Sequence, residues 1–550
     1  MTPADLADAV RGSVQAAADA GDLAAPAPAE LVVERPRNPD HGDYYTNVAM
    51  RLAKAAGKPP REVAEIIAAR LREHDGVALV DVAGPGFLNI TLATGSLGQV
   101  ARTIVEAGVA YGRTTQLTGL KINLEFVSAN PTGPVHLGHT RWAALGDSLH
   151  RLLEAAGADV TAEHYVNDFG SQMDRFGASL LAAATGEPVP EDGYHGDYIF
   201  DVAKHILEQR PDVLSLPPNE AREVFRNLSE ELMREEQKAS LARFNVAFDV
   251  WFSEQKMHDS GAVDAAIERL RAQGHVFEAD GATWLRTTDF GDDKDRVLIR
   301  SNGEKTYFAP DTAYYLDKRG RGFDRCIYML GADHHGYVAR LRAIVAAAGD
   351  DPDQTLEVLI GQMVKLLQDG RELKLSKRAG TLITLDEFVD LVGVDAGRYS
   401  LARWSADTPL TLDVAEITRR SNENPVYYVQ YAHARTCNAK RNAADVGIGL
   451  DVFEPELLTS PFEAALLTAL GEFPRIVATA AELRAPHRVA RYLEDLAGSY
   501  HRWYDACRII PKGDDEITAV NRTRAWVNDA TRIVLANGLH LLGVSAPERL

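Results

Sequence analysis

The chain has 550 residues, of which 45% are hydrophobic and 25% are charged, and its formal net charge is −20. This length is too great for one hydrophobic core and predicts three or four structural units. The acidic total argues against indiscriminate binding to nucleic acid, so DNA is not an expected partner, although a local basic surface is compatible with it.

Cysteine content and hydropathy argue against a disulfide-rich, a membrane-spanning and a secreted protein. The three cysteines lie far apart, which argues against a disulfide framework and excludes a four-cysteine zinc site; they are Cys326, Cys437 and Cys507. No apolar run approaches the ~20 residues that a membrane-spanning helix needs. The first 23 residues form an acidic amphipathic pattern without the basic start and apolar middle of a signal peptide. We therefore expect a cytoplasmic protein with no membrane partner and no metal held by the protein alone.

Residues 1–112 are predicted to form a small α+β domain. An amphipathic helix opens the chain, and an Ala/Pro-rich stretch, a strand-like segment with a Gly-containing turn and a second amphipathic helix follow it. GPGFLNITLA (84–93) alternates with a period of two, which predicts a strand, and helical periodicity follows over 96–110.

Residues 113–400 carry the signals of a Rossmann-type α/β domain. LKINLEFVS (120–128) and DVTAEHYV (159–166) are predicted strands separated by a turn and a helix, as in a βαβ unit. The charge-rich helical region that follows, together with later hairpin signals, is interpreted as an insertion over about 186–300. Strand signals over 325–331 and 356–367 then restore the α/β pattern.

Strand signals fade beyond 415, and helical periodicity continues to the end of the chain. Residues 401–550 are therefore predicted to form an all-helical bundle. The expected fold class is multidomain α/β: a small α+β N-terminal domain, a Rossmann-type domain with an insertion, and a helical C-terminal bundle.

The turn after the first strand of the α/β domain contains a His-x-Gly-His pattern. Residues 125–139 are EFVSANPTGPVHLGH, and such a turn at the carboxyl edge of a parallel strand is where α/β folds bind phosphate-bearing ligands. Gly138 allows close backbone approach, and His136 and His139 can direct imidazole N–H groups at phosphate oxygens. Taken alone, an H-x-x-H pair is more often structural, and a metal site is disfavoured because no third ligand stands nearby.

A lysine pair lies some 235 residues downstream. In DGRELKLSKRAGT, Lys374 and Lys377 stand between Gly370 and Gly380. An ammonium on a flexible stem can follow the charge of a transferring phosphate. A lone K-x-S-K is usually a solvated basic turn, but the combination with the histidine turn is far rarer.

Both motifs resemble the HIGH and KMSKS signatures of class I aminoacyl-tRNA synthetases. Longer strings resemble one family of that class, the arginyl-tRNA synthetases, and they span the chain: NPDHGDYYTNVAM, EFVSANPTGPVHLGHTR, HYVNDFGSQM, GADHHGYVARL, SNENPVYYVQYAHAR and GLHLLGVSAPERL. The departures are Leu375 for Met, Arg378 for Ser and a final Leu550 for Met.

The resemblance implies ATP-dependent ligation of L-arginine to its cognate tRNA through an arginyl-adenylate, with Mg2+ bound through the ATP phosphates. The implied catalytic residues are His136, His139, Lys374 and Lys377. The implied ATP site comprises His136, Gly138, His139, Gly331, Asp333, Lys374 and Lys377.

Arginine recognition requires planar carboxylate partners for the guanidinium group. The residues that the resemblance implies for this site are Glu125, Ser128, Asn130, His139, Tyr307, Asp311 and His335. Some relatives have Gln in place of His335. A single acid is more often a helix cap or an ion-pair partner, so the prediction depends on the set.

A local basic segment supplies a candidate tRNA surface. Residues 418–441 hold five Lys or Arg and one Glu, and Asn424 and Pro425 are predicted to start a helix there, with Asn424 as its cap. Aromatic side chains interleaved with cations suit splayed bases, and the expected set is Tyr427, Tyr428, Tyr431 and Arg435. Packing of these tyrosines in the bundle core is the alternative. In the N-terminal domain the resemblance implies tRNA contacts at Asn38, His41 and Asp43, of which His41 and Asp43 differ from the residues of some relatives.

Three rival functions remain at this point. Another class I synthetase, such as the cysteine enzyme, would need a thiol-selective zinc site, and three cysteines far apart in the sequence offer few ligands for one. Small HxGH nucleotidylyltransferases have no use for a helical C-terminal bundle. A non-catalytic tRNA-binding paralogue would not need both motifs intact. We expect a monomer with tRNA, L-arginine and ATP as its partners, and leave open whether arginine activation requires bound tRNA.

Overall fold

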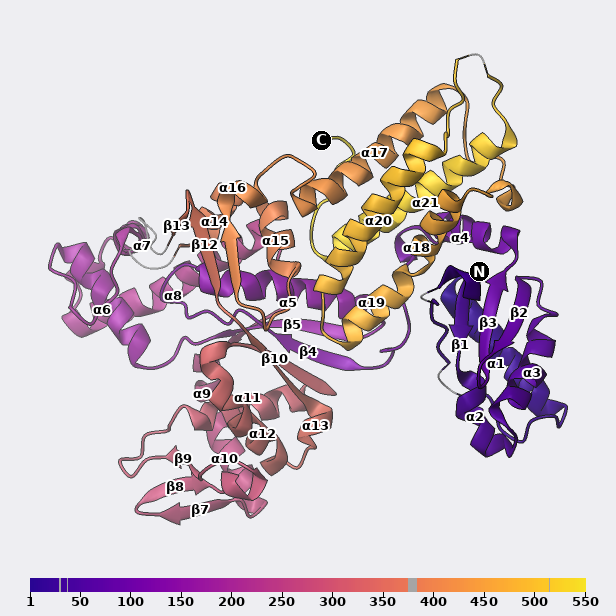
Figure 1. The fold of residues 1–550 in the computed structure, drawn as a ribbon. Coiled ribbons are helices and arrows are strands. Elements are labelled where there is room, and N and C mark those ends of the chain that lie inside the picture. Colours follow the sequence, from indigo (N-terminus) through magenta and orange to yellow (C-terminus); the bar gives the residue numbers. More distant parts are fainter. Residues whose placement is uncertain (29–30, 37, 374–382, 514) are drawn as a thin grey trace.

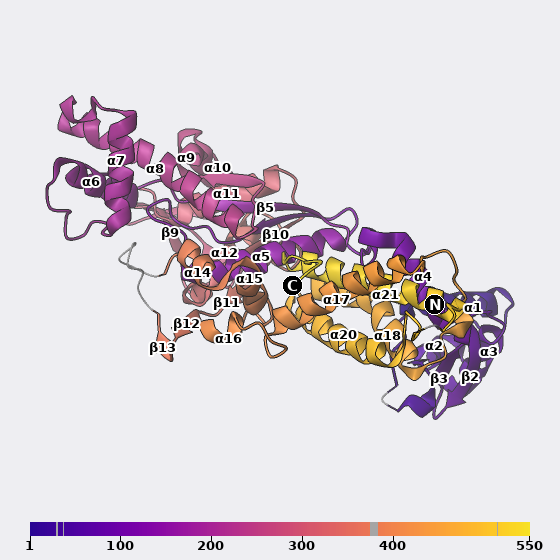
Figure 2. The same cartoon turned by 90° about the horizontal axis from the view of Figure 1, so that it is seen from above.

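A computed structural model describes residues 1–28, 31–36, 38–373, 383–513 and 515–550. It contains an N-terminal α+β region, a parallel-sheet domain and a C-terminal helical bundle, so the expected fold class is confirmed (Figure 1). Figures 1 and 2 both place the N-terminal region and helices α6 and α7 at opposite ends of an elongated molecule. Lys374 and Lys377 lie outside the described residues.

The N-terminal region is a three-stranded antiparallel sheet covered by helices. Its strand order is β1-β3-β2, and Val63, Ile67, Val80 and Ile90 are fully buried in its core. Helix α1 begins with a capping box in which Thr2 and Asp5 satisfy each other's backbone N–H groups. The elements are α1 (Pro3–Asp19), a 3-10 helix (Pro39–His41), β1 (Tyr44–Thr46), α2 (Val48–Ala56), α3 (Pro60–Leu71), β2 (Val77–Ala83) and β3 (Phe87–Leu92).

Helix α4 (Thr94–Ala107) connects this region to the rest of the chain but packs against the C-terminal bundle. Val100, Ala101 and Ile104 are buried in the same core as α18 (Pro461–Gly471) and α21 (Ala519–Leu541). A Cβ added at Gly98 would lie 2.8 Å from the carbonyl oxygen of Pro455, so the close approach requires glycine there. The two ends of the chain thus share one packing interface.

The central sheet is parallel and has the strand order β11-β10-β4-β5-β6. Chain order reverses between β4 and β10, which places the ligand crevice of an open α/β sheet at their carboxyl ends. Helix α5 (Leu137–Ala155) follows β4 and contributes Leu145, Leu149 and Leu152 to the core. The strands are β4 (Lys121–Glu125), β5 (Asp159–Val166), β6 (Val250–Ser253), β10 (Arg325–Gly331) and β11 (Leu356–Gly361).

The expected insertion over about 186–300 needs correction, because β6 lies within that range and pairs in parallel with β5 as an edge strand of the central sheet. Before β6 stands a helical unit with its own apolar core: α6 (Ser171–Thr185), α7 (Asp197–Gln209), a 3-10 helix (Val213–Ser215) and α8 (Pro218–Arg243). After β6 come α9 (Glu254–Asp259), α10 (Ala262–Ala272), β7 (Val276–Ala279), β8 (Ala282–Leu285), a 3-10 helix (Thr287–Phe290) and β9 (Arg296–Ile299). The hairpin prediction for this segment is confirmed, since β7, β8 and β9 form an antiparallel sheet.

The second half of the α/β domain leads into a small sheet and then into the bundle. Strand β12 pairs with β13 and, in parallel, with β14. These elements are α11 (Phe308–Gly320), a 3-10 helix (Ala332–Tyr337), α12 (Val338–Ala347), α13 (Pro352–Thr355), β12 (Val364–Gln368), β13 (Arg371–Glu372), α14 (Leu385–Val392), α15 (Val394–Ala402), β14 (Leu410–Asp413) and α16 (Val414–Ile417).

The C-terminal bundle consists of α17 (Pro425–Asp445), a 3-10 helix (Pro455–Leu457), α18, α19 (Phe473–Glu482), α20 (His487–Ala506) and α21. Asn424 stands at the N-cap of α17 as predicted, but its side chain makes no capping bond. Its amide donates instead to the carbonyl oxygens of Ile417 and Arg419, which ties the helix start to the preceding turn.

One apolar segment of the described chain is long enough to cross a membrane by length and composition alone. It runs from Pro461 to Glu482 with a mean hydropathy of 1.2, and half of it is buried. The segment is divided between α18 and α19, and its apolar residues include Leu466, Leu470 and Val477 of the bundle core.

Candidate functional site

The histidine turn is organised by the start of helix α5. His136 is the N-cap residue, and its Nδ1 accepts a hydrogen bond from the backbone N–H of Gly138 at 3.2 Å. Because Nδ1 is an acceptor, the proton of the neutral ring resides on Nε2, which is left as a donor. A Cβ at Gly138 would lie 3.0 Å from the His136 ring, so a larger residue would crowd this imidazole.

His139 stacks on His136, with ring centroids 4.0 Å apart. Burial, with His136 and His164 nearby, lowers the pKa of His139 to about 3, and burial also lowers the pKa of His136. Both imidazoles are therefore neutral at physiological pH. His139 Nδ1 is buried without a hydrogen-bond partner among the described residues, so a ligand or a water would satisfy it.

The backbone between β4 and this turn is strained. Val127 and Ser128 have φ angles of 67° and 45°, a region that a β-branched residue such as Val rarely adopts. Ser128 Oγ holds the turn in place by donating to Glu125 Oε1 and accepting from the Tyr165 backbone N–H, each at 3.1 Å. Asn130 follows with an exposed side chain, so the first half of the predicted arginine site lies on one short segment.

Two predicted residues of the ATP site, Gly331 and Asp333, and one of the arginine site, His335, lie at the end of the neighbouring strand. Gly331 ends β10, which pairs directly with β4, and Asp333 and His335 lie in the 3-10 helix that follows. His335 is exposed. The structure thus brings these positions to the same edge of the sheet as the histidine turn.

Residues that follow the lysine motif are also anchored at the histidine turn. The Leu137 N–H donates to the Ile383 carbonyl oxygen, and the Leu385 N–H donates to the Val135 carbonyl oxygen, each at 2.7 Å. His136 and Thr384 form an isolated antiparallel bridge between the two segments. Residues 383–385, which follow the lysine motif, therefore lie beside the imidazole pair.

Three carboxylates gather near the strained turn. Asp311 lies in the first turn of α11, and Glu254 and Glu125 both act on its charge. Burial, together with Glu254 and Glu125, raises the pKa of Asp311 to about 8. Burial, followed by Asp168, raises the pKa of Glu254 to about 7 despite a hydrogen bond from Tyr165. Both shifts are caused mainly by burial, with neighbouring carboxylates adding to it, so a bound cation would favour the ionised forms of Asp311 and Glu254.

Glu254 was missed by the sequence reasoning. It follows directly after β6, at the same carboxyl edge as Glu125, and it is buried. Its position immediately after a parallel strand could have identified Glu254 as a candidate site residue. That inference would have required recognising the four residues of β6 as a strand.

A cavity of about 520 Å³ is lined by Glu254 but not by Asp311 or Glu125. Glu254, Tyr307 and Pro310 line it together with Phe169 and His258, and the two rings of Phe169 and His258 stack at 3.9 Å. Tyr307 is 80% exposed, so the predicted arginine contact projects into open space at the mouth of the cavity.

The predicted anticodon residues lie together on helix α17. Tyr427 and Tyr431 stack in parallel with centroids 6.3 Å apart, and Tyr428 and Tyr431 both contact the His501 ring of α20. Arg435 lies 4.3 Å above the Tyr504 ring and pairs with Asp505. Tyr431 is 39% exposed, whereas Tyr427 and Tyr428 are partly buried and Tyr428 packs against the bundle core, so the cluster is only partly open to solvent.

The cations of that segment are largely paired, which the sequence could not reveal. Arg419 pairs with Glu423, Lys440 with Asp529 of α21 and Arg441 with Glu548 near the chain end. Acids from other elements therefore offset most of the local positive charge, and the patch is aromatic more than basic.

The three predicted N-terminal contacts differ in their surroundings. Asn38 and His41 are exposed, whereas the Asp43 carboxylate accepts a hydrogen bond from the Leu92 N–H at 2.8 Å and so ties the turn to strand β3.

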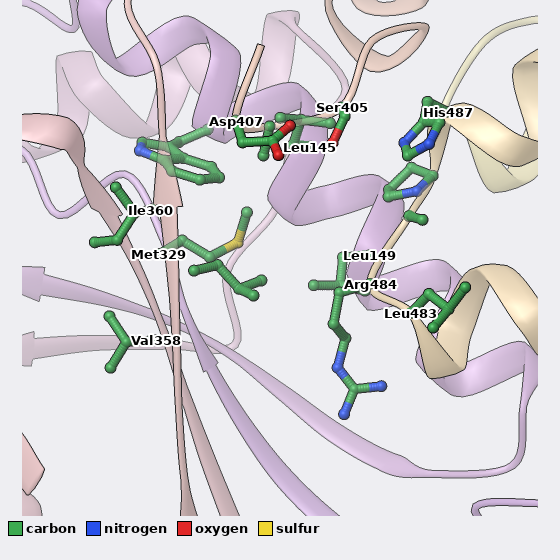
Figure 3. A pocket seen from close by; sticks show the side chains of 15 residues that line it. Leu145, Leu149, Met329, Val358, Ile360, Ser405, Asp407, Leu483, Arg484 and His487 are labelled. Carbon is green, nitrogen blue, oxygen red and sulfur yellow. The ribbon is translucent and has the colours of Figure 1, made fainter. Parts of the chain in front are cut away.

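A separate hollow of about 230 Å³ lies between the central sheet and the bundle (Figure 3). Its wall is apolar on one side, with Leu145, Met329 and Val358, while Arg484 and His487 approach from the C-terminal bundle. None of the predicted site residues that the structure describes lines this hollow.

Comparisons with known proteins agree with this arrangement. Residues 4–92 match the family model of the arginyl tRNA synthetase N terminal domain, 102–398 the class I (R) tRNA synthetase catalytic domain, and 429–550 the DALR anticodon binding domain. The catalytic match alone spans more than half of the chain.

The chain belongs to the arginyl-tRNA synthetase family.

The resemblance found in the motifs is thereby confirmed. Relatives in this family include the arginine–tRNA ligases of Kineococcus radiotolerans and Clavibacter sepedonicus, each 60% identical with full coverage of both chains. The solved Thermus thermophilus arginyl-tRNA synthetase is 26% identical, with a TM-score of 0.74 and full coverage of both chains. A Mycobacterium tuberculosis methionyl-tRNA synthetase shares the fold at 14% identity and a TM-score of 0.52, over 77% of this chain and 89% of the other.

Proposed function

We propose that the chain ligates L-arginine to its cognate tRNA in two steps. In the first step a carboxylate oxygen of arginine attacks the α-phosphorus of ATP, and the bond to the departing pyrophosphate breaks. In the second step a hydroxyl of the terminal tRNA ribose attacks the arginyl carbonyl carbon, and AMP leaves. The observation that carries the proposal is a stacked pair of neutral imidazoles at the sheet edge, together with the buried carboxyl groups of Asp311 and Glu254, whose pKa values are raised.

The imidazole pair is proposed to hold the ATP phosphates. The Nε2–H of His136 and an N–H of His139 would donate to phosphate oxygens as charge shifts toward pyrophosphate. Neutral rings suit this role because they need no proton exchange with solvent. Gly138, Gly331 and Asp333 complete the proposed nucleotide site.

Lys374 and Lys377 are proposed to stabilise the leaving pyrophosphate, on the strength of their motif and of the anchoring of residues 383–385 beside His136. Mg2+ is proposed to arrive with ATP on its phosphates, as is usual for this ion. Among the described residues no group of three or more His, Cys, Asp or Glu is placed to hold a metal, and no step is assigned to the ion.

The carboxylate cluster is proposed to select arginine. Asp311 and Glu254 would face the guanidinium group, which needs planar acceptors and is always charged. Glu125, Ser128, Asn130, His139, Tyr307 and His335 are the further proposed contacts with the amino acid. Lysine would meet the same charges but could not make the forked hydrogen bonds.

The tRNA is proposed to contact both ends of the chain. Tyr427, Tyr428, Tyr431 and Arg435 would receive unstacked anticodon bases, and Asn38, His41 and Asp43 would contact the elbow. The proposed acting form is a monomer, and the proposed address is the cytoplasm.

Pyrophosphate exchange and tRNA charging with each amino acid test the proposal. Purified protein should exchange and charge with arginine, and tRNA should be present in the exchange assay so that a tRNA requirement does not mask activity. Exchange with another amino acid but not with arginine would overturn the assignment.

A further inference from the structure

A buried ammonium group lies beneath the proposed arginine site. Lys318 stands seven residues after Asp311 on α11, two helical turns away on the same face, and its side chain is fully buried. Its Nζ lies 2.6 Å from Glu125 Oε2. The same Nζ lies 3.8 Å from the Tyr328 ring centroid and 4.2 Å from that of Tyr314, so two aromatic faces complete its surroundings.

Stability alone is a poor reason for this pair. Removing an ammonium and a carboxylate from water costs about as much as their attraction returns, and apolar replacements of buried ion pairs are often neutral or stabilising. A buried pair is better explained where one partner has a second task.

Glu125 has such a task, because it links Lys318 to the strained turn. Oε2 of Glu125 binds Lys318, while Oε1 accepts the hydroxyl proton of Ser128. Ser128 in turn accepts from the Tyr165 backbone N–H, and Val127 and Ser128 both have positive φ angles. A backbone in this region persists only where surrounding contacts determine it.

We propose that Lys318 is a positioning residue for arginine activation: it fixes the Glu125 carboxylate and, through Ser128, the strained turn that begins the amino-acid site. The inference rests on the proposed function for the identity of the substrate. Lys318 is buried and does not contact substrate, and its effect passes through Glu125.

A neighbouring ion pair supplies a matched control. Glu163 stands opposite Glu125 in the register of β4 and β5, is fully buried, and pairs with Arg321, the C-cap residue of α11. Its carboxylate also accepts from the Tyr314 hydroxyl at 2.6 Å and from the Asn123 amide at 3.0 Å. None of these partners belongs to the 127–130 turn, so this pair resembles the Lys318 pair in its buried carboxylate and neighbouring strand but has no link to the turn; the Arg321 side chain itself is 29% exposed.

The test compares Lys318→Met with Arg321→Met in full-length protein, by pyrophosphate exchange with tRNA present and by thermal unfolding. Lys318→Met should raise the arginine KM at least about tenfold, the loss expected for one charge-assisted hydrogen bond, and leave the ATP KM within about twofold. Arg321→Met should also lower the Tm, because it leaves buried Glu163 without its cation, but it should leave the arginine KM within about twofold.

A double variant separates positioning from stability. Lys318→Met with Glu125→Gln removes both charges, so the Tm should recover toward wild type, and the arginine KM should match that of Glu125→Gln alone because the effect of Lys318 passes through Glu125. An arginine KM in the double variant well above that of Glu125→Gln, an unchanged arginine KM in soluble Lys318→Met, or an equal KM rise in Arg321→Met would each overturn the inference. Absence of arginine exchange in the wild-type protein would instead overturn the proposed function.

Discussion

Arginine binding should depend steeply on pH, because Asp311 must be ionised to hold a guanidinium group. With its pKa raised to about 8 by burial and by Glu254 and Glu125, Asp311 is mostly protonated at pH 7 in the empty site. If only the ionised form binds, the apparent KM scales with the reciprocal of the ionised fraction, so it should fall about 25-fold between pH 6.5 and 8.5. Glu254, whose pKa is raised to about 7, should make the arginine KM rise more steeply at the acidic end of this pH range.

The assay is the arginine KM in pyrophosphate exchange at saturating ATP, with tRNA present, over that pH range. Other groups near the acids are unsuited to produce the effect: Lys318 is committed to Glu125, and burial lowers the pKa of His258. Burial also lowers the pKa of both His136 and His139, which moves the titration of these rings toward pH values below this range. The ATP KM should therefore change much less than the arginine KM.

Asp311→Asn is the matching variant. It should raise the arginine KM at pH 8.5 by about 10- to 100-fold, since a charge-assisted hydrogen bond is lost, and shift the remaining pH dependence below pH 7. Because the folded-state pKa lies above the unfolded value, ionisation of Asp311 destabilises the fold increasingly as the pH rises from about 4 to 8. The variant should thus have a higher Tm than wild type at pH 8 without arginine. A flat pH profile in the wild-type protein, or the same profile in the variant, would refute the reasoning.

Three further outcomes are expected. His139→Gln should slow arginine activation by about 10²- to 10³-fold with little change in Tm, because His139 Nδ1 has no partner among the described residues; a full-rate variant would contradict the phosphate role. Tyr431→Ala should weaken tRNA binding about tenfold in a filter-binding assay, as loss of one stacked base predicts, whereas Phe at that position should retain affinity. Arg141→Lys should lower the free energy of unfolding by about 2–4 kcal/mol in denaturant titrations, because Arg141 donates to the carbonyl oxygens of Gln362, Ser405 and Thr408; an unchanged midpoint would show that water replaces these bonds.

Long elements with strong periodicity were predictable from the sequence. The strand, turn and helix that carry His136 and His139 have extended apolar patterns and a clear stop at Gly157, and the structure reproduces them. Strand β6 was not predictable, because its four residues, VWFS, have no period long enough to separate a strand from a loop. Since Glu254 follows β6 directly, missing the strand also meant missing that acid.

Contacts between elements that are far apart in the sequence could not be predicted, for a different reason. The Lys318–Glu125 pair joins residues 193 positions apart, and the pairs that neutralise Lys440 and Arg441 come from other helices or the chain end. Local spacing carries no information about such partners. Likewise, Asn424 was predicted to cap a helix because asparagine often does. Its side-chain amide instead donates hydrogen bonds to two carbonyl groups of the preceding turn.

Helix α4 has a consequence for the length of RNA that the molecule accepts. It continues from the N-terminal sheet yet is buried among the C-terminal helices, so the two regions proposed to touch tRNA are held at a set spacing. A transcript with a truncated or unfolded arm could not reach both regions at once. Discrimination against damaged tRNA would then arise from an apolar interface, around Val100 and Ile104, that never contacts RNA.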